Sequence, residues 1–379
     1  MTDGQTRGPF NDLVVLELAS VLAGPSVGQY FAELGARVIK IENPATGGDV
    51  TRTWYAAGED RSSPAAYFQS CNQGKESVTL DLKSDTGQHA LHCLVERAHV
   101  VLTNALPSSA IRAGIDANSL HAMRPGLLVG VISGYPDDAA RPGYDAIVQA
   151  EAGYYHLNGT GDIPVKLPVA FVDVLAAHQL KEALLVALYD QARSDSRQNR
   201  TLHVHLLDAA LSGLMNQAAG FLKTGTDPGA IGSEHPMIAP YGSIYTTQDG
   251  ARIVLAVGTD RQFRALCASV APSLAHDERF TRNADRVTHR ESLNEALQHA
   301  LVSLNSDDIL ATCRREGIPA GRVSTLAHAV VHAPDDLSLV NGFRHAVARE
   351  SGHFTGRSGL APAPKLGAHT DAVLTEFCG

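Results

Sequence analysis

One carboxylate, Asp173, stands between a mostly apolar stretch and the start of a predicted helix. The stretch is 167–172, and the helix is expected over 174–194. Partial burial and the helix N-terminus together would leave this carboxylate poorly solvated yet ionised, which makes a usable oxygen nucleophile. An aspartate at a helix start is also a common N-cap. This segment alone leaves two compatible roles open for Asp173, nucleophile and helix cap.

The elements expected before this helix alternate in the manner of an α/β fold. Apolar periodicity and turn residues predict strands at 12–18, 37–42, 99–103 and 127–134, and helices at 26–34, 86–97 and 143–157. The order strand, helix, strand is a βαβ unit, which implies a parallel sheet. We therefore predict a Rossmann-like large domain. The GxGxxG fingerprint is missing, which argues against a dinucleotide-dependent dehydrogenase.

The later part of the chain predicts a second, smaller α/β domain. A Gly- and Pro-rich stretch at 224–236 marks a boundary, and a hairpin pattern over 241–257 follows it. We predict a large domain from residues 1–224, a small domain from residues 225–320 and a C-terminal part from residues 321–379.

The composition excludes several classes of protein. The chain has 379 residues, 44% hydrophobic and 19% charged, as ordinary globular proteins do. A net charge of -9 offers no basic footprint for nucleic acid, so an anionic ligand would need a local cluster of Lys, Arg and backbone N–H groups. The sequence has no CxxC or HExxH motif, which argues against a zinc site. Without a signal-peptide pattern or an apolar run of about 18 residues, we expect a cytoplasmic protein that does not enter a membrane.

Short motifs follow one another in a characteristic order along essentially the whole chain. They are Val21–Pro25, Leu34–Glu42, Asn72–Ser77, Leu80–Lys83, Arg141–Asp145, Pro168–Asp173, Leu206–Ala209, Gly232–Tyr241, Gly317–Gly321 and Leu366–Thr370. In this order they resemble the family III coenzyme A transferases, the CaiB/BaiF-type superfamily that includes formyl-CoA transferase and carnitine CoA-transferase. The resemblance implies an interlocked homodimer in which both ends of each chain build the large domain.

The resemblance also implies a reaction, CoA transfer between carboxylic acids. Asp173 would attack an acyl-CoA to give an aspartyl anhydride, and the released CoA would then give an aspartyl-CoA thioester. The partners would be an acyl-CoA donor and a small or medium carboxylic acid, with succinate-like dicarboxylates among the candidates. Coenzyme A would enter as a substrate, and no cofactor would be bound permanently.

Further site residues follow from the same resemblance. Those expected to contact the oxyanion or the substrate are Val21, Leu22, Ala23, Tyr135, Tyr144, Asp145, Gly232 and His235. Those expected to contact coenzyme A are Arg52, Asn72, Lys75, Asn104 and Arg112. For these groups a plain role, such as a turn residue or a solvated surface charge, stays open. The loop 135–141, which shapes the mouth of the site in relatives, is shorter than in the common family pattern, so the resemblance does not by itself identify the acid pair.

Two alternatives accompany this prediction. A 2-methylacyl-CoA racemase of the same fold would pair an acid with a base, and racemases place a histidine where this chain has Tyr144. Tyrosine suits that task poorly, since its ordinary pKa is about 10. A non-catalytic acyl-CoA-binding protein is the other alternative, and it would not need Asp173.

Overall fold

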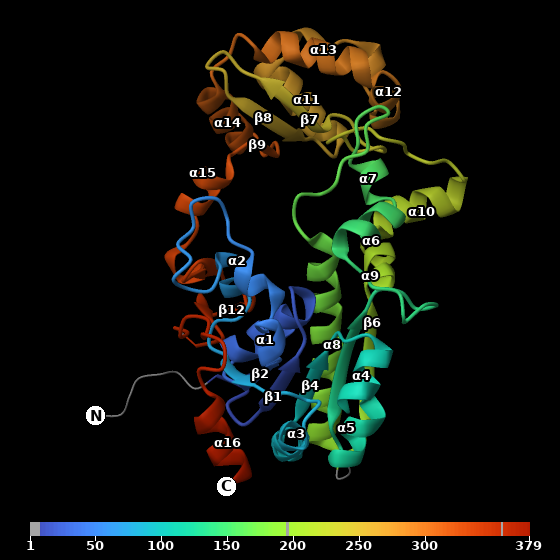
Figure 1. Ribbon diagram of the computed structural model, residues 1–379. Coiled ribbons are helices and arrows are strands. Elements are labelled where there is room, and N and C mark those ends of the chain that lie inside the picture. The colour runs from blue at the N-terminus through green and yellow to red at the C-terminus, as the bar shows by residue number, and fades with distance from the viewer. Residues whose placement is uncertain (1–7, 195–196, 358) are drawn as a thin grey trace. The chain divides into compact units, whose positions relative to one another are not determined.

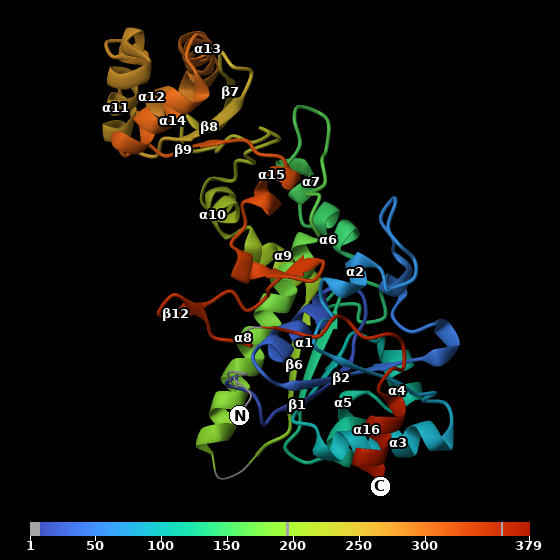
Figure 2. The same ribbon diagram turned by 90° about the vertical axis from the view of Figure 1, so that its left-hand side faces the viewer.

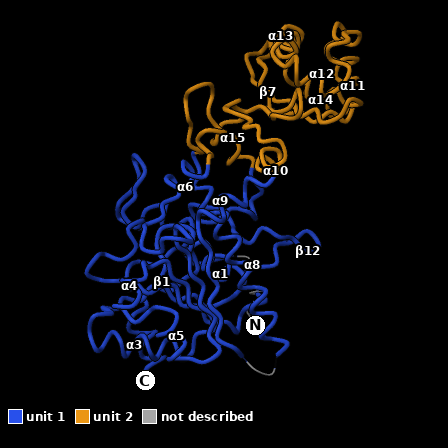
Figure 3. Tube along the Cα trace, turned by 90° about the vertical axis from the view of Figure 1, so that its right-hand side faces the viewer, with its two compact units in different colours: residues 1–152, 168–215, 333–379 blue, residues 153–167, 216–332 orange. Residues whose placement is uncertain are grey.

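The computed structural model describes residues 8–194, 197–357 and 359–379, and it forms two compact units (Figure 3). Unit 1 comprises the chain up to Ala152, Pro168–Met215 and Ala333–Gly379, and unit 2 comprises Gly153–Leu167 and Asn216–His332. The observed division differs in detail from the predicted limits at 224 and 320, because 153–167, 216–224 and 321–332 all belong to unit 2.

Unit 1 is built on a six-stranded sheet in the order β3-β2-β1-β4-β5-β6, with every neighbouring pair parallel. The strands are β1 (Val14–Leu18), β2 (Arg37–Glu42), β3 (Glu76–Thr79), β4 (Val100–Thr103), β5 (Leu128–Ser133) and β6 (Arg200–His205). This is the strand order of the doubly wound dinucleotide-binding folds, although the glycine fingerprint is missing. The prediction of a parallel α/β sheet is confirmed.

Helices cover both faces of this sheet (Figure 1, Figure 2). On one face α1 (Ala23–Glu33) packs against the long α8 (Phe171–Arg193), which also contacts β5 and β6. The opposite face carries α3 (Asp85–Arg97), α5 (Ala117–Met123) and α16 (Thr370–Cys378). The other helices of unit 1 are α2 (Ala66–Gln69), α4 (Pro107–Ala113), α6 (Asp145–Glu151) and α9 (Leu206–Gly213).

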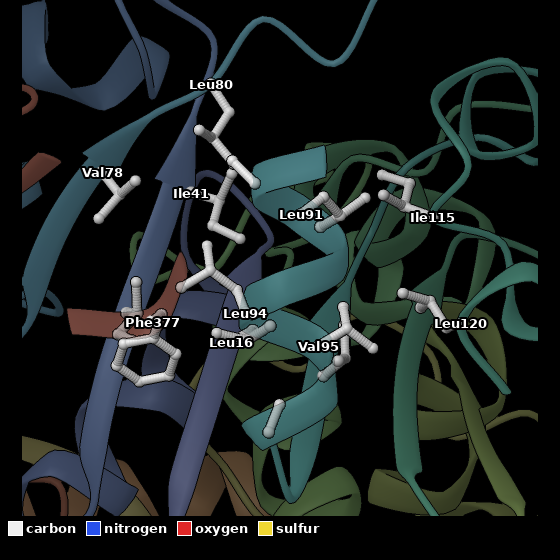
Figure 4. Close-up of a cluster of buried hydrophobic side chains, with 14 of the residues drawn as sticks. Leu16, Ile41, Val78, Leu80, Leu91, Leu94, Val95, Ile115, Leu120 and Phe377 are labelled. Atoms are coloured by element: carbon white, nitrogen blue, oxygen red, sulfur yellow. The ribbon is translucent and has the colours of Figure 1, made fainter. Parts of the chain in front are cut away.

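The apolar core of the second face joins the two ends of the chain (Figure 4). Leu16 and Ile41 from the strands meet Leu91 and Leu94 of α3, and Phe377 of α16 packs in the same cluster. The C-terminal segment thus returns to the sheet that the N-terminal segment begins. It also carries two short hairpins, β10 (Ser338–Leu339) with β11 (Gly342–Phe343), and β12 (Arg349–Glu350) with β13 (His353–Phe354).

Unit 2 contains a three-stranded antiparallel sheet in the order β7-β8-β9 and a helical layer with its own core. The strands are β7 (Tyr241–Thr246), β8 (Arg252–Ala256) and β9 (Ala320–Arg322). The helices are α7 (Tyr154–Leu157), α10 (Met215–Thr224, whose first residue belongs to unit 1), α11 (Asp260–Val270), α12 (Asn283–Thr288), α13 (Arg290–Leu301), α14 (Ser306–Arg315) and α15 (Leu326–Val331). The hairpin predicted over 241–257 is confirmed as β7 and β8.

Two helix predictions need correction. The single helix expected over 143–157 is two helices, α6 and α7, because Gly153 between them takes a left-handed conformation with a φ of 91°. The helix expected from residue 174 begins earlier, at Phe171. Among the described residues, none of the helices combines the length and the apolarity that a membrane crossing requires.

Candidate active site

A cavity of about 300 Å³ lies at the carboxyl ends of the central strands of unit 1. Its lining includes Ser20–Ala23 after β1, Asn104–Leu106 after β4 and Ile132–Gly134 at the end of β5. The strand order reverses between β1 and β4, and ligands of open α/β sheets bind at such a switch point. We call this space the switch-point cavity. Asp173 and Asp145 are its two acidic lining residues.

Asp173 enters the cavity from the first turn of α8. The helix N-cap is Ala170, which makes no side-chain cap, and Asp173 is the third helical residue. The N-cap interpretation of Asp173 is therefore wrong, because the helix starts three residues earlier than its apolar periodicity suggested. The Asp173 side chain is half-buried and free of capping duty.

Asp145, the first residue of α6, instead caps the N-terminus of α8. Its Oδ2 accepts hydrogen bonds from the backbone N–H groups of Val172 at 2.8 Å and Asp173 at 3.3 Å. Its Oδ1 accepts a hydrogen bond from Gln149 Nε2 at 2.6 Å. Asp145 is buried, so these contacts hold a second negative charge beside Asp173. The two carboxylates are 28 residues apart in sequence, and only tertiary packing brings them together.

The environment of Asp173 favours its neutral form. Burial, followed by the negative charge of Asp145, raises the pKa of Asp173 to about 7. The expectation that the helix N-terminus would hold Asp173 fully ionised is wrong, because the N–H groups there already bind Asp145. At neutral pH the carboxylate and the carboxylic acid forms of Asp173 coexist.

One group near Asp173 was missed from the sequence. Tyr67 on α2 packs edge-on against Trp54 at a centroid distance of 5.2 Å. Burial and then the charge of Asp173 raise the pKa of Tyr67 to about 12, so its phenol stays protonated. A lone tyrosine on a short helix gives no sequence signal for such a role.

The sequence matches a known protein family over most of its length. A family model described as CoA-transferase family III matches residues 10–370. The chain belongs to CoA-transferase family III.

Relatives of this CoA-transferase are similar over most or all of their length. This chain is 35% identical to the succinate–glutarate CoA-transferase of Agrobacterium fabrum, in an alignment that covers 100% of this chain and 98% of that protein. It is 34% identical to the acetyl-CoA:oxalate CoA-transferase of Acetobacter aceti, covering 86% of this chain and 84% of that protein. A crystal structure of a CaiB/BaiF family protein from Brucella suis matches with a TM-score of 0.80 and 34% identity, covering 98% of this chain and all of that chain. Relatives named as CoA-transferases favour that activity over the racemase and the binding-protein alternatives.

The turn residues predicted for the oxyanion do line the CoA-transferase's cavity. Val21 and Leu22 lie between β1 and α1, Ala23 is the first residue of α1, and Val21 has a positive φ of 73°. Asn104 also lines the cavity, but both ends of its amide hold the turn: Oδ1 accepts from Ser20 N at 3.1 Å, and Nδ2 donates to Ser20 O at 2.9 Å. Asn104 is thus placed to shape the site, and a contact with coenzyme A stays a prediction.

The two tyrosines predicted for the site differ. Tyr144 lines the cavity and is 61% exposed. Tyr135 is buried outside the lining, where its hydroxyl donates to Glu151 at 2.7 Å and Arg141 lies over its ring at 3.9 Å. Tyr135 therefore anchors the short loop that follows β5 instead of facing the cavity.

The cations predicted for coenzyme A are not gathered at the cavity. Lys75 is buried, and its ammonium group donates hydrogen bonds to Glu17, Pro25 O and Asn72 Oδ1. Asn72 is buried as well, and its side-chain oxygen is occupied by Lys75. Arg52 is buried in a two-pronged contact with Glu42 and lies over the Phe68 ring. These groups hold the interior together, so the contact with coenzyme A predicted for Lys75 and Arg52 is not supported.

Arg112 is the exposed member of that set. It lies in the last turn of α4 and donates from Nη2 to Ser109 Oγ at 3.0 Å. It does not belong to the lining of the switch-point cavity, which within the described residues contains no Lys or Arg. A contact between Arg112 and the phosphates of coenzyme A stays a prediction.

Gly232 and His235 belong to unit 2. Gly232 has a φ of 66° and its N–H donates to Gly159 O at 2.9 Å. His235 Nδ1 accepts a hydrogen bond from Met237 N at 3.2 Å, and burial followed by Arg290 lowers the pKa of His235. His235 is therefore neutral at pH 7, and the part of both residues in catalysis stays a prediction.

The pKa of Asp173 predicts the pH dependence of the reaction. Because only the ionised carboxylate is nucleophilic, kcat/KM for the acyl-CoA should rise with a slope of one as pH increases and level off above about 7. Acetyl-CoA should be the varied donor, because it has no acyl carboxylate that titrates in this range. A limb centred near the ordinary aspartate pKa of about 4 would contradict the prediction.

Proposed function

We propose that this enzyme moves coenzyme A from an acyl-CoA donor to a free carboxylic acid through covalent intermediates on Asp173. The observation that carries the proposal is a half-buried carboxylate with a pKa of about 7, which lines a cavity at the switch point of a parallel sheet. A desolvated carboxylate with a raised pKa is a stronger nucleophile than a solvated one, yet a large fraction is ionised at pH 7.

The proposed reaction passes through two kinds of covalent intermediate on Asp173, a mixed anhydride and a CoA thioester. An Asp173 oxygen attacks the thioester carbon, the C–S bond breaks, and the products are a mixed anhydride and CoA thiolate. The thiolate attacks the aspartyl carbonyl of the anhydride, which releases the first acid and leaves an aspartyl-CoA thioester. The acceptor carboxylate attacks that thioester, and the freed thiolate then takes the acceptor acyl group and returns Asp173 to its carboxylate form.

Asp145 contributes to the first step by its position. While Asp173 is ionised, two negative charges lie close together, and attack on the thioester removes the charge from Asp173. The transition state therefore relieves repulsion that the free enzyme carries. Asp145 also fixes the first turn of α8, so the nucleophile is aimed before the substrate arrives.

Backbone N–H groups are proposed to bind the oxyanion of each tetrahedral stage. Leu22 and Ala23 line the cavity at the start of α1, and the first N–H groups of a helix have no partner within it. Gly232 and His235 are proposed as further substrate contacts, as the family resemblance implies.

For the substrates we propose dicarboxylic acids and their CoA thioesters. The relatives named above act on succinate, glutarate or oxalate by their names, and each of these is a dicarboxylate.

We also propose the interlocked homodimer of the family. Large apolar side chains exposed in unit 1, Val186 and Tyr189 on α8 and Leu211 on α9, support a covering partner. The five free cysteines suit the cytoplasmic location that we propose.

Covalent trapping tests this proposal directly. The enzyme should be incubated with acetyl-CoA or succinyl-CoA without an acceptor, quenched in acid and analysed by peptide mass spectrometry. We expect a CoA adduct on the peptide containing Asp173, which borohydride reduces and hydroxylamine converts to a hydroxamate. The same treatment without acyl-CoA is the control. Active exchange with no modification at Asp173 would disprove the mechanism.

A further inference from the structure

A buried network of four charged side chains lies under the turn between β1 and α1. Glu17 on β1 binds Lys40 at 2.9 Å and Lys75 at 2.7 Å, and Lys40 also contacts Asp49 at 3.0 Å. Each of the four residues is at most 4% exposed. Two carboxylates and two ammonium groups balance in charge, and we call these four residues the buried network.

The buried network forms three hydrogen bonds with the turn. The contacts are Lys40 Nζ to Ala19 O at 2.8 Å, Val21 N to Asp49 Oδ2 at 3.2 Å and Lys75 Nζ to Pro25 O at 2.9 Å. They secure the two ends of the segment 19–25 and its middle. Gly28 of α1 leaves the room for this arrangement, because a Cβ added there would overlap Glu17 Oε2.

Val21 is the strained residue of the turn. Its φ of 73° lies in the left-handed region, which a β-branched side chain very rarely adopts. Such a conformation persists only where the surrounding contacts impose it, and it is concentrated at functional sites. The carboxylate of Asp49 accepts the Val21 N–H, so Asp49 is placed to impose it.

Asp49 is itself held rigidly and in its ionised form. Its Oδ1 accepts hydrogen bonds from Thr51 N at 3.0 Å and Thr51 Oγ1 at 2.7 Å. Although burial works to raise the pKa of Asp49, the Lys40 ammonium and the Thr51 hydrogen bonds hold it below the usual value. An ionised acceptor binds an N–H group more strongly than a neutral one.

Buried ion pairs are weak evidence for stability, because the loss of solvation offsets their attraction. The geometry of this network points to a different use. We propose that Asp49 is a positioning residue for CoA transfer: it holds Val21 in its left-handed conformation and so directs the backbone N–H groups of Leu22 and Ala23 toward the switch-point cavity. This inference rests on the proposed function and assigns a role to a residue outside the cavity lining.

Steady-state kinetics of the isosteric variant Asp49→Asn test this role. A group that acts on the oxyanion should change kcat and leave binding of the ground state nearly unaltered. We expect kcat to fall about 10- to 100-fold while KM for the acyl-CoA changes by less than about threefold. A merely structural role would lower the melting temperature without this split between kcat and KM.

The matched control is Glu33→Gln. Glu33 is a fully buried carboxylate of the same unit, accepts N–H groups of His345 and Ala346, and among the described residues forms no hydrogen bond or ion pair with the turn. It should lose thermal stability as Asp49→Asn does, while kcat stays within about twofold of the wild type. A loss of kcat in Glu33→Gln equal to that in Asp49→Asn would overturn the proposal.

A rescue experiment separates strain from general damage. Glycine adopts a positive φ without strain, so Val21→Gly should make Asp49 less necessary. The double variant Val21→Gly with Asp49→Asn should have a higher kcat than Asp49→Asn alone, and the effects should be non-additive. Should Asp49→Asn not fold, Thr51→Val is the milder probe, with an expected fall in kcat of about 2- to 10-fold. Wild-type kcat in a folded Asp49→Asn or, failing that, in Thr51→Val would refute the role.

The outcome for Asp49 is distinguishable from failure of the proposed function. If no adduct forms on Asp173 in the wild-type enzyme, the reaction itself has been misassigned. If the adduct forms and Asp49→Asn keeps wild-type kcat, the chemistry on Asp173 stands and only the positioning role of Asp49 is wrong.

Discussion

Replacing Asp173 by alanine is expected to lower kcat for CoA exchange by at least about a thousandfold. The alanine variant has no oxygen that can attack the thioester. The other carboxylate of the cavity, Asp145, cannot substitute, because its oxygens accept hydrogen bonds from Val172, Asp173 and Gln149. The measurement is the rate of CoA exchange between an acyl-CoA and a dicarboxylic acid at pH 8, where wild-type Asp173 is mostly ionised.

A matched control for that experiment is Asp85→Ala. Asp85 also lies in the first turn of a helix of unit 1, and it is exposed outside the switch-point cavity. This variant should keep wild-type kcat. Exchange that continues in a folded Asp173→Ala variant at more than about a tenth of the wild-type rate would rule out Asp173 as the nucleophile.

Changing Asp145 is expected to have the second largest effect, on both stability and rate. Asp145→Ala leaves the N–H groups of Val172 and Asp173 without their acceptor in a partly buried place. We expect the free energy of unfolding to fall by about 1–3 kcal/mol. The loosened first turn of α8 should also lower kcat by about 10- to 100-fold, because the nucleophile is no longer aimed.

The isosteric variant Asp145→Asn isolates the electrostatic part of this effect. It keeps one oxygen acceptor and removes the negative charge that, after burial, raises the pKa of Asp173. Losing a like charge favours the ionised form of Asp173, so the limb of kcat/KM should move to a pH below 7. Asp116→Asn, which changes a capping aspartate of α5 outside the cavity lining, should leave that limb in place. An unmoved limb in Asp145→Asn would contradict the coupling of the two carboxylates.

Local patterns were sufficient to predict the α/β architecture. The strand expected at 37–42 matches β2 residue for residue, and the strand expected at 127–134 contains β5. Strands buried on both faces read as continuous apolar runs, and turns between them carry glycine, so each element is encoded by residues close in sequence. The helix starts were less certain. Phe171 and Val172 read equally well as an apolar approach to a helix and as its first turn.

The candidate site was only partly predictable, because pKa values and ion pairs depend on residues that are distant in the sequence. Asp173 was identified by its setting and by the order of the surrounding motifs, and its raised pKa was not, because that depends on Asp145 from another helix. Lys75 and Arg52 were expected to bind an anionic ligand. A sequence does not show that their partners, Glu17 and Glu42, are buried beside them.

The sequence by itself determined the family, the parallel sheet and the carboxylate on which the proposed reaction depends, because these follow from residue type, periodicity and motif order. Only the tertiary structure decided which groups act on that carboxylate and which cations are already committed to the interior. The physical reason is that pKa values and ion pairs depend on distance and burial in space. Asp145 and Asp173, or Glu17 and Lys75, become neighbours only when the chain has folded.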